Sequence, residues 1–160
     1  MLGTMQLKNL VKPKQINIDL NATNKDDAIN QLALLLEQGG IVTSINEFTE
    51  AVYERETLTT TAIGFGVAIP HAKSSSVIEP GVAIGRSPGF SWDQETDFPI
   101  NLVFLLAVPE RIESPEYMGI LASISRMLVH EEFRNSLIEA KDINKFISII
   151  SNGTKYLVNQ

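Results

Sequence analysis

The 160-residue sequence contains no cysteine and only two histidines, His71 and His130. Without cysteine, disulfide bonds, thiolate catalysis and zinc–thiolate sites are excluded. The two histidines are far apart in the sequence, and the metalloprotease pattern HExxH is absent. A site made only of carboxylates would remain, but nothing in the sequence indicates one. We therefore expect neither a metal nor a cofactor.

Long hydrophobic runs are also missing. The longest, Leu102 to Val108, is far too short to span a bilayer. The first residues, MLGTMQLKNLVKPK, lack the apolar core of a secretory signal. We therefore expect a cytoplasmic protein. Met5 offers an alternative start, so we interpret residues 1–5 or thereabouts as a flexible leader.

Positive charge is scarce relative to negative charge. Lysine and arginine total 13 against 19 aspartate and glutamate residues, which gives a net charge of -6. An acidic surface repels the phosphates of nucleic acids and anionic membranes, so neither is an expected partner, whereas a basic protein would suit it. The composition is typical of a globular protein, and no linker or repeat divides the chain. We expect one domain spanning residues 1–160.

Three common catalytic motifs are absent as well. The sequence has no G-x-S-x-G nucleophile elbow, no Walker A loop and no dinucleotide-binding fingerprint. A serine hydrolase, a P-loop enzyme and a nicotinamide-dependent enzyme are therefore disfavoured.

What is present is an alternation of strand and helix patterns. The run LVFLLAV at 102–108 is apolar at every residue, which predicts a central strand covered on both faces. Further strands are predicted at 16–20 and 80–87, with a loop around Pro88 and Gly89. Helices are predicted after Asn24, Ser44 and Ser114, and over 131–140 and 142–151. This order predicts an α/β fold, a mixed parallel and antiparallel sheet sandwiched by helices on both faces.

Local signals fix the starts of the helices. Asn24 is a good N-cap, and Ser44 with Glu47 forms a capping box. The second helix is expected to end near Arg55. Pro115 suits the first turn of a helix. One face of that helix is expected to contain Met118, Leu121, Ser125 and Leu128.

His71 is the stronger candidate for chemistry because its backbone is constrained. Pro70 fixes its own φ and restricts Ile69 to extended conformations, so His71 leaves a stiff strand end at a defined angle. Gly64 and Gly66 allow tight turns just before it. A rigidly displayed imidazole suits a nucleophile. From the residues alone, a structural histidine in a turn is slightly favoured over this role, and His130 is interpreted as a helix cap or surface residue.

A longer motif surrounds His71. The run RETLTTTAIGFGVAIPHAK, residues 55–73, resembles the enzyme IIA component of the bacterial phosphoenolpyruvate-dependent sugar phosphotransferase system. The resemblance is to its fructose/mannitol class (type 2), which includes nitrogen-regulatory members. It extends over nearly the whole chain, through LVFLLAVP and ILASISRML. It decides in favour of a chemical role for His71.

The resemblance implies a phosphohistidine carrier and hence a phosphotransferase component. Phosphorylated HPr would give its phosphoryl group to His71, which would pass it to a IIB domain or protein of a fructose-like system. Contact with the membrane would then be indirect, through the permease. The accepting atom in this family is Nε2, so an acceptor should hold the proton on Nδ1. No metal is required.

The resemblance also assigns supporting roles to three residues. Arg55 would grip phosphoryl oxygens, although a charge that complements the helix dipole is the alternative. Thr61 would donate a hydrogen bond to the phosphoryl group, or only pack in its loop. Tyr117 stands where the family usually has a second histidine, in Y-M-G-I-L instead of H-L-x-x-L. This departure keeps two alternatives open, a regulatory protein of the nitrogen-regulatory type and a binding module that no longer accepts phosphate.

Overall fold

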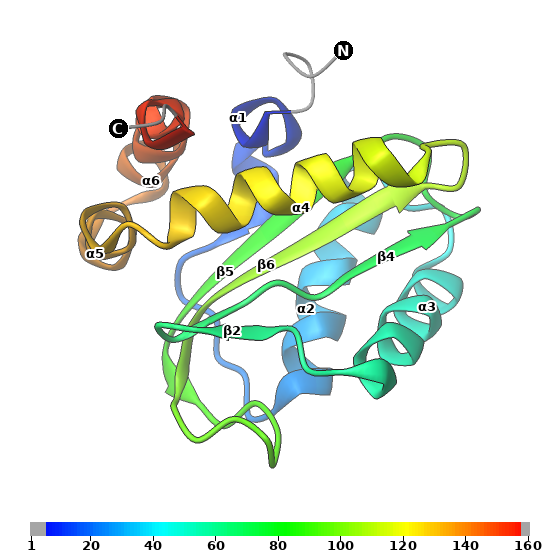
Figure 1. Ribbon diagram of the computed structural model, residues 1–160, viewed down its shortest axis with the longest axis horizontal. Coiled ribbons are helices and arrows are strands. Elements are labelled where there is room, and N and C mark those ends of the chain that lie inside the picture. Colours follow the sequence, from blue (N-terminus) through cyan, green and yellow to red (C-terminus); the bar gives the residue numbers. More distant parts are fainter. Residues whose placement is uncertain (1–5, 158–160) are drawn as a thin grey trace.

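The computed structural model describes residues 6–157, so the predicted leader at 1–5 lies outside the described residues (Figure 1). The strands are β1 (Ile16–Asn17), β2 (Ala62–Gly64), β3 (Val67–Ala68), β4 (His71–Ser74), β5 (Gly81–Phe90) and β6 (Ile100–Pro109). The α-helices are α1 (Leu7–Leu10), α2 (Lys25–Gln38), α3 (Ile45–Leu58), α4 (Ser114–Leu128), α5 (Glu131–Glu139) and α6 (Ile143–Asn152). Two short 3-10 helices are η2 (Pro13–Gln15) and η3 (Gly153–Leu157).

The strands form one mixed sheet, as predicted. Its order is β1-β5-β6-β3-β2, and β4 also pairs with β6. β5 is antiparallel to β6, whereas β3 and β4 both run parallel to β6. β3 and β4 therefore lie one after the other along the same side of β6, with Val67 opposite Leu102 and His71 opposite Leu106.

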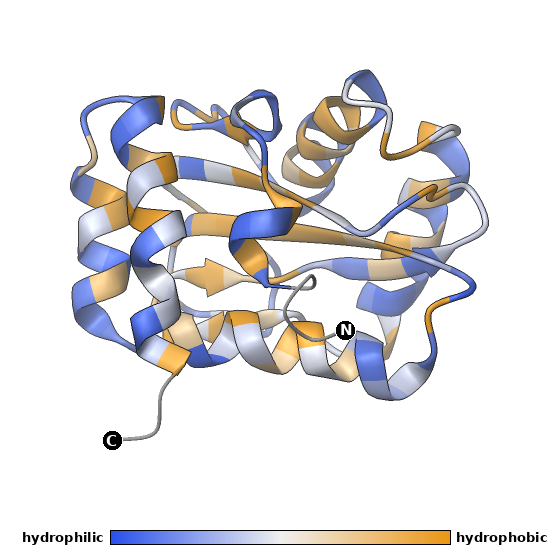
Figure 2. Cartoon of the chain, turned by 90° about the horizontal axis from the view of Figure 1, so that it is seen from above, coloured by the Kyte–Doolittle hydropathy of each residue, from blue (hydrophilic) through white to orange (hydrophobic). Residues whose placement is uncertain are grey.

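Helices cover both faces of the sheet, which confirms the prediction made from the apolar run in β6. Alternate side chains point to opposite faces of a strand. Phe104 and Leu106 pack in a cluster with residues of α1, α4, α5 and α6, while Val103 and Leu105 pack with residues of α2 and α3. Figure 1 shows α4 crossing one face of the sheet and α2 on the other. In Figure 2 the strands in the middle are mostly hydrophobic and the helices carry hydrophilic segments as well.

Two of the expected helix caps are present. The Asn24 side chain accepts a hydrogen bond from the backbone N–H of Asp27 at 2.8 Å, and that of Ser44 accepts one from Glu47 at 3.3 Å. Each satisfies a backbone donor that has no partner inside its helix. α3 continues to Leu58, about one turn beyond the expected end.

Only part of the predicted face of α4 is buried, because Leu128 is buried and Leu121 packs against the core cluster, but Met118 does not. The buried residues of the helix are Ile120, Ile124, Met127 and Leu128, whereas Met118 is 62% exposed. The helix has apolar residues on more than one side, so periodicity alone does not say which row meets the sheet. Packing against the sheet and against α1 and α5 selects the row.

The strand bounds differ from prediction at two places. β1 ends at Asn17, and Leu20 is held beyond it by a backbone hydrogen bond from its N–H to the carbonyl of Arg86, at 2.8 Å. β5 continues through Pro88 and Gly89 to Phe90, where a loop was expected. An irregularity in the β5–β6 register between Arg86 and Phe90 accommodates these residues.

Within the described range 6–157, no helix is both long and apolar enough to cross a membrane.

Candidate functional site around His71

His71 is the first residue of β4 and is 8% exposed. The next residue, Ala72, packs in the cluster of α2 and α3, so His71 points to the opposite face of the sheet, where α4 lies. There its ring meets the ring of Tyr117, from the first turn of α4, edge to face at 5.9 Å between centroids. The structure therefore brings together two residues predicted for the site.

One ring nitrogen of His71 is fixed by the backbone. Nδ1 lies 2.7 Å from the carbonyl oxygen of Ile69. A carbonyl oxygen only accepts hydrogen bonds, so Nδ1 carries the proton and Nε2 keeps its lone pair. Pro70, between the two residues, holds the turn that makes this contact. The contribution of Ile69 was not predicted, because the sequence shows that a residue precedes Pro70 but not where its carbonyl points.

The surroundings of His71 favour the neutral imidazole. Burial lowers its pKa below the ordinary value of 6.5, and the positive charge of Arg55 lowers it further. The hydrogen bond with Ile69 opposes these effects, but the net direction is downward. At neutral pH the ring is therefore uncharged and has a free lone pair on Nε2.

Arg55 lies in the last turn of α3, where its guanidinium donates a hydrogen bond to the carbonyl oxygen of Thr59 at 3.0 Å. It is close enough to lower the pKa of both His71 and Tyr117. Burial dominates at Tyr117 and raises the pKa of its hydroxyl to about 12, so this group stays protonated near neutral pH. The buried imidazole thus has the ring of Tyr117 in contact with it and the cation of Arg55 near enough to affect its pKa.

Thr61 is buried, and its hydroxyl donates to the Oε1 atom of Glu56. A threonine hydroxyl has one proton to donate. The predicted hydrogen bond from Thr61 to a phosphoryl group would require the hydroxyl proton to leave Glu56, and it stays a prediction. Through its backbone, Thr61 is linked to the His71 turn, because its carbonyl accepts from the N–H of Ile69 at 3.0 Å.

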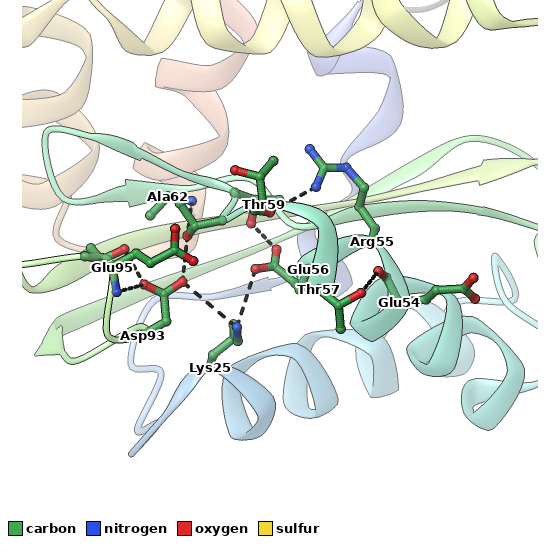
Figure 3. A network of polar contacts seen from close by, with 12 residues as sticks. Lys25, Glu54, Arg55, Glu56, Thr57, Thr59, Ala62, Asp93 and Glu95 are labelled. Carbon is green, nitrogen blue, oxygen red and sulfur yellow. Dashed lines mark hydrogen bonds and ion pairs between the residues drawn. The ribbon is translucent and has the colours of Figure 1, made fainter.

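A charged cluster beneath this segment was not predicted. Lys25, the first residue of α2, lies 3.7 Å from Oε2 of Glu56 and 4.0 Å from Oδ2 of Asp93. Figure 3 shows Lys25 between the two carboxylates, with Arg55 reaching toward Thr59 on the other side of the segment. No motif linked Lys25, Glu56 and Asp93 in the sequence, because each belongs to a different element.

His130 lies away from these contacts. It occupies the N-cap position of α5, makes no side-chain capping hydrogen bond, and has its ring 4.8 Å from that of Tyr156. The part of the chain covered by the structure holds no group of three or more His, Cys, Asp or Glu residues placed to bind a metal ion.

The fold and this site define a class of protein. A histidine at the start of a strand, with Nδ1 hydrogen-bonded to a backbone carbonyl and a cation near enough to lower its pKa, has features that suit a nucleophile. Residues 9–153 match the family model described as "Phosphoenolpyruvate-dependent sugar phosphotransferase system, EIIA 2". The chain belongs to this family, the type-2 enzyme IIA of the fructose/mannitol class, and is a phosphotransferase component that carries a phosphoryl group.

Two relatives illustrate the sequence similarity. The fructose-specific EIIA component of Haloferax volcanii is 37% identical over 127 residues, which are 79% of this chain and 82% of that protein. The fructose-specific EIIABC component of Bacillus subtilis is 32% identical over 152 residues, 94% of this chain. The match spans only 24% of that longer protein.

Solved structures show the same fold. The nitrogen regulatory protein IIA-Ntr from Neisseria meningitidis superposes with a TM-score of 0.80 at 25% identity, covering 89% of this chain and 97% of that one. The mannitol IIA of Escherichia coli gives a TM-score of 0.75 at 24% identity, over 88% of this chain and 98% of that one.

Proposed function

We propose that this protein takes a phosphoryl group from phosphorylated HPr onto Nε2 of His71 and passes it to a IIB component of a fructose-like sugar transport system. The observation that carries the proposal is the hydrogen bond between Nδ1 of His71 and the carbonyl of Ile69, at 2.7 Å. It leaves Nε2 as the nitrogen with a lone pair, on a ring that burial keeps neutral.

In the transfer step the phosphoryl group moves from the imidazole of the donor to that of His71. The Nε2 lone pair of His71 attacks the phosphorus of the donor phosphohistidine, and a new P–N bond forms. The donor's P–N bond breaks, and its electron pair returns to the donor nitrogen. With the donor ring protonated on its other nitrogen, each ring keeps its N–H throughout. Phospho-His71 then holds its Nδ1 proton against the Ile69 carbonyl, and the reverse steps deliver the group to IIB.

In this proposal two side chains, those of Arg55 and Tyr117, would stabilise the transferring group. Its three oxygens carry negative charge while it lies between two rings, and fixed donors lower the barrier to such a transfer. Arg55 offers a planar fork that suits two phosphoryl oxygens. Tyr117 offers a hydroxyl that stays protonated, since its pKa is about 12.

Exposed apolar side chains near the site support docking of protein partners. Leu58 is 77% exposed at the end of α3, next to Thr59, and Met118 is 62% exposed beside Tyr117. Apolar side chains at the centre of an interface provide much of its binding free energy. The fructose-specific names of relatives at 32% and 37% identity support a fructose-like system.

A regulatory role is the second candidate. It is favoured by the similarity to IIA-Ntr of Neisseria meningitidis, and by Tyr117 at the position of the second family histidine. In that role phosphorylation of His71 would control a binding partner instead of feeding a IIB component.

Phosphoryl uptake tests the proposal directly. The protein is incubated with phosphoenolpyruvate, enzyme I and HPr, and its intact mass is followed with and without a fructose-type IIB. We expect one phosphoryl group on wild type and on His130→Ala, none on a folded His71→Ala, and discharge to IIB. Uptake that persists in His71→Ala would contradict the assignment of His71, whereas uptake without discharge would favour the regulatory role.

A further inference from the structure

Glu56 is a buried carboxylate that the transfer step does not use. Its side chain is 3% exposed, and it follows Arg55 directly in the last turn of α3. Consecutive helical residues point about 100° apart. Glu56 therefore points toward Lys25, while Arg55 reaches toward Thr59, as Figure 3 shows. Burying a carboxylate is costly unless it is paired, so its contacts merit a functional explanation.

The two oxygens of Glu56 hold different partners. Oε1 accepts the hydroxyl proton of Thr61, and Oε2 lies 3.7 Å from Nζ of Lys25 without a hydrogen bond. Lys25 also lies 4.0 Å from Asp93, which accepts the hydroxyl of Thr60 at 2.7 Å. The side chains of two consecutive threonines are thus held by two carboxylates that share one lysine.

The backbone of residues 59–61 is hydrogen-bonded to Arg55 directly and to the turn before His71 through Ile69. The carbonyl of Thr59 accepts a hydrogen bond from Arg55 at 3.0 Å. The carbonyl of Thr61 accepts from the N–H of Ile69 at 3.0 Å, and the carbonyl of Ile69 holds Nδ1 of His71 at 2.7 Å. A continuous series of contacts therefore runs from Glu56 through Thr61 and Ile69 to the imidazole.

We propose that Glu56 is a positioning residue for phosphoryl transfer. Through the Thr61 hydroxyl it fixes residues 59–61, and this segment in turn sets the tautomer of His71 and the place of the Arg55 guanidinium. The role rests on the proposed function, since it concerns the same site. The residue acts at a distance from the phosphoryl group, so its loss alters geometry without removing a contact to that group.

Three variants separate this role from a general loss of stability. Glu56→Ala removes both contacts, Thr61→Val removes the hydroxyl, and Glu56→Gln keeps an acceptor for Thr61. Asp142→Ala is the control, because it also removes a carboxylate, the N-cap of α6 that accepts from the N–H of Lys145 at 2.8 Å, away from the site. All are compared with wild type by thermal unfolding.

Two readouts decide the outcome. The ¹⁵N shifts of the His71 ring report its tautomer without any phosphoryl donor, and rapid-quench kinetics report transfer from phosphorylated HPr. For Glu56→Ala and Thr61→Val we expect a mixture of tautomers and transfer about 10- to 100-fold slower, the size expected from a small misplacement of reacting groups. Glu56→Gln and Asp142→Ala should keep the wild-type tautomer and most of the rate.

The double variant Glu56→Ala/Thr61→Val gives the sharpest test. If Glu56 acts through Thr61, the double variant is no slower than the slower single variant. Additive losses would overturn the proposal and indicate that Thr61 contacts the phosphoryl group itself. Wild-type ring shifts and rate in Thr61→Val would also overturn it, even if Glu56→Ala does not fold. If wild type accepts no phosphoryl group, the proposed function fails and the ring shifts alone decide on Glu56.

Discussion

At the scale of single residues, His71 combines two properties that are hard to obtain together. A nucleophilic imidazole must be neutral, yet a cation is needed beside it to receive the phosphoryl group. Here burial and Arg55 both lower the pKa of His71, so the cation favours the reactive form of the ring and does not compete with it.

Arg55 gives the first prediction. Arg55→Ala should slow transfer from HPr by about 10² to 10³-fold, the loss typical of removing one preorganised donor. Arg55→Lys should recover only part of the rate, because a lysine offers no planar fork. Single-turnover kinetics with the folded variants make the measurement. An unchanged rate in Arg55→Ala would leave Arg55 a helix-end charge whose hydrogen bond to Thr59 is only structural.

The lowered pKa of His71 predicts a pH dependence. The free lone pair is lost when the ring is protonated, so the transfer rate should fall at acid pH, and the midpoint of this decline should lie below pH 6.5. Because Arg55 contributes to the lowering, Arg55→Ala should shift this acid limb upward. Rates measured over a pH series for both proteins check the expectation. A midpoint of the acid limb above pH 6.5 in wild type would contradict it.

The same shift has a consequence for stability. The unfolded chain binds a proton to His71 at a higher pH than the folded one, so the free energy of unfolding rises with pH across this window. The contribution of the buried neutral ring is present above pH 6.5 and is lost as the pH falls through the lower, folded pKa. Denaturant unfolding at several pH values should show this slope in wild type. In His71→Gln the slope should be smaller, and an equal slope would mean that other groups produce it.

Tyr117 gives a residue-scale prediction about the phosphorylated state. Tyr117→His should place a group that can become positive near phospho-His71 and slow its hydrolysis several-fold, equivalent to roughly 1 kcal/mol after desolvation. Tyr117→Phe should speed hydrolysis by less, because one hydroxyl donor is lost. Half-lives of the three phosphoproteins are compared at one pH. Identical half-lives would show that Tyr117 only packs against the imidazole.

At the scale of elements, the turn between β2 and β3 determines how closely β3, and β4 after it, approach β6. Gly66 has φ +76°, and its carbonyl accepts from the N–H groups of Asn101 and Leu102 at the start of β6. A Cβ there would lie 2.7 Å from Oδ1 of Asn101. A residue with a side chain is therefore unfavourable at position 66, both because its φ is positive and because a Cβ would clash with Asn101. β3 therefore enters the sheet close against β6, and β4 follows in register with it.

Gly66→Ala should consequently destabilise the protein by about 1 to 3 kcal/mol. Gly40→Ala is a matched control, because Gly40 has φ +79° but no atom within 4 Å of an added Cβ. Gly40→Ala should lower the free energy of unfolding only through its unfavourable positive φ, by about 1 kcal/mol. Chemical denaturation of both variants gives the comparison. Equal losses would mean that the close approach to Asn101 has no energetic effect.

At the scale of the whole molecule, helices from both faces of the sheet contribute residues to the candidate site. α3, which covers one face, carries Arg55, while α4, which covers the other, carries Tyr117 in ring contact with His71 of β4, and Arg55 is near enough to lower the pKa of both. If His71 is the phosphoryl acceptor, as proposed, we expect a partner to contact exposed residues of both helices. Leu58, the last residue of α3, and Met118, next to Tyr117 in α4, are both exposed.

This arrangement predicts separate effects on docking and on chemistry. Leu58→Ser and Met118→Ser should raise the HPr concentration for half-maximal transfer several-fold, with little change in the maximal rate or in stability. Leu34→Ser is the control, because Leu34 is also exposed but lies in the middle of α2. Titrating HPr against each variant makes the test. The same shift in the control would argue against a specific docking surface.

Much of this protein was determined by the sequence itself. The fully apolar run in β6 predicts a strand covered on both faces, and Asn24 and Ser44 predict two helix starts, because these signals are local and depend on few neighbours. Pro70 constrains the backbone at His71 without help from distant residues. The single domain over residues 1–160 and the roles of His71, Arg55, Thr61 and Tyr117 stay predictions for the experiments above.

Only the tertiary structure decided which groups meet. Lys25, Glu56 and Asp93 are far apart in the sequence, and nothing local indicates that they form one charged cluster. α4 has apolar residues on several sides, and packing against the sheet determines which of them are buried. The tautomer of His71 depends on where one carbonyl points, which the pairing of β3 and β4 with β6 fixes. Contacts of this kind arise from packing between elements, because hydrogen-bond direction and burial are properties of the assembled chain.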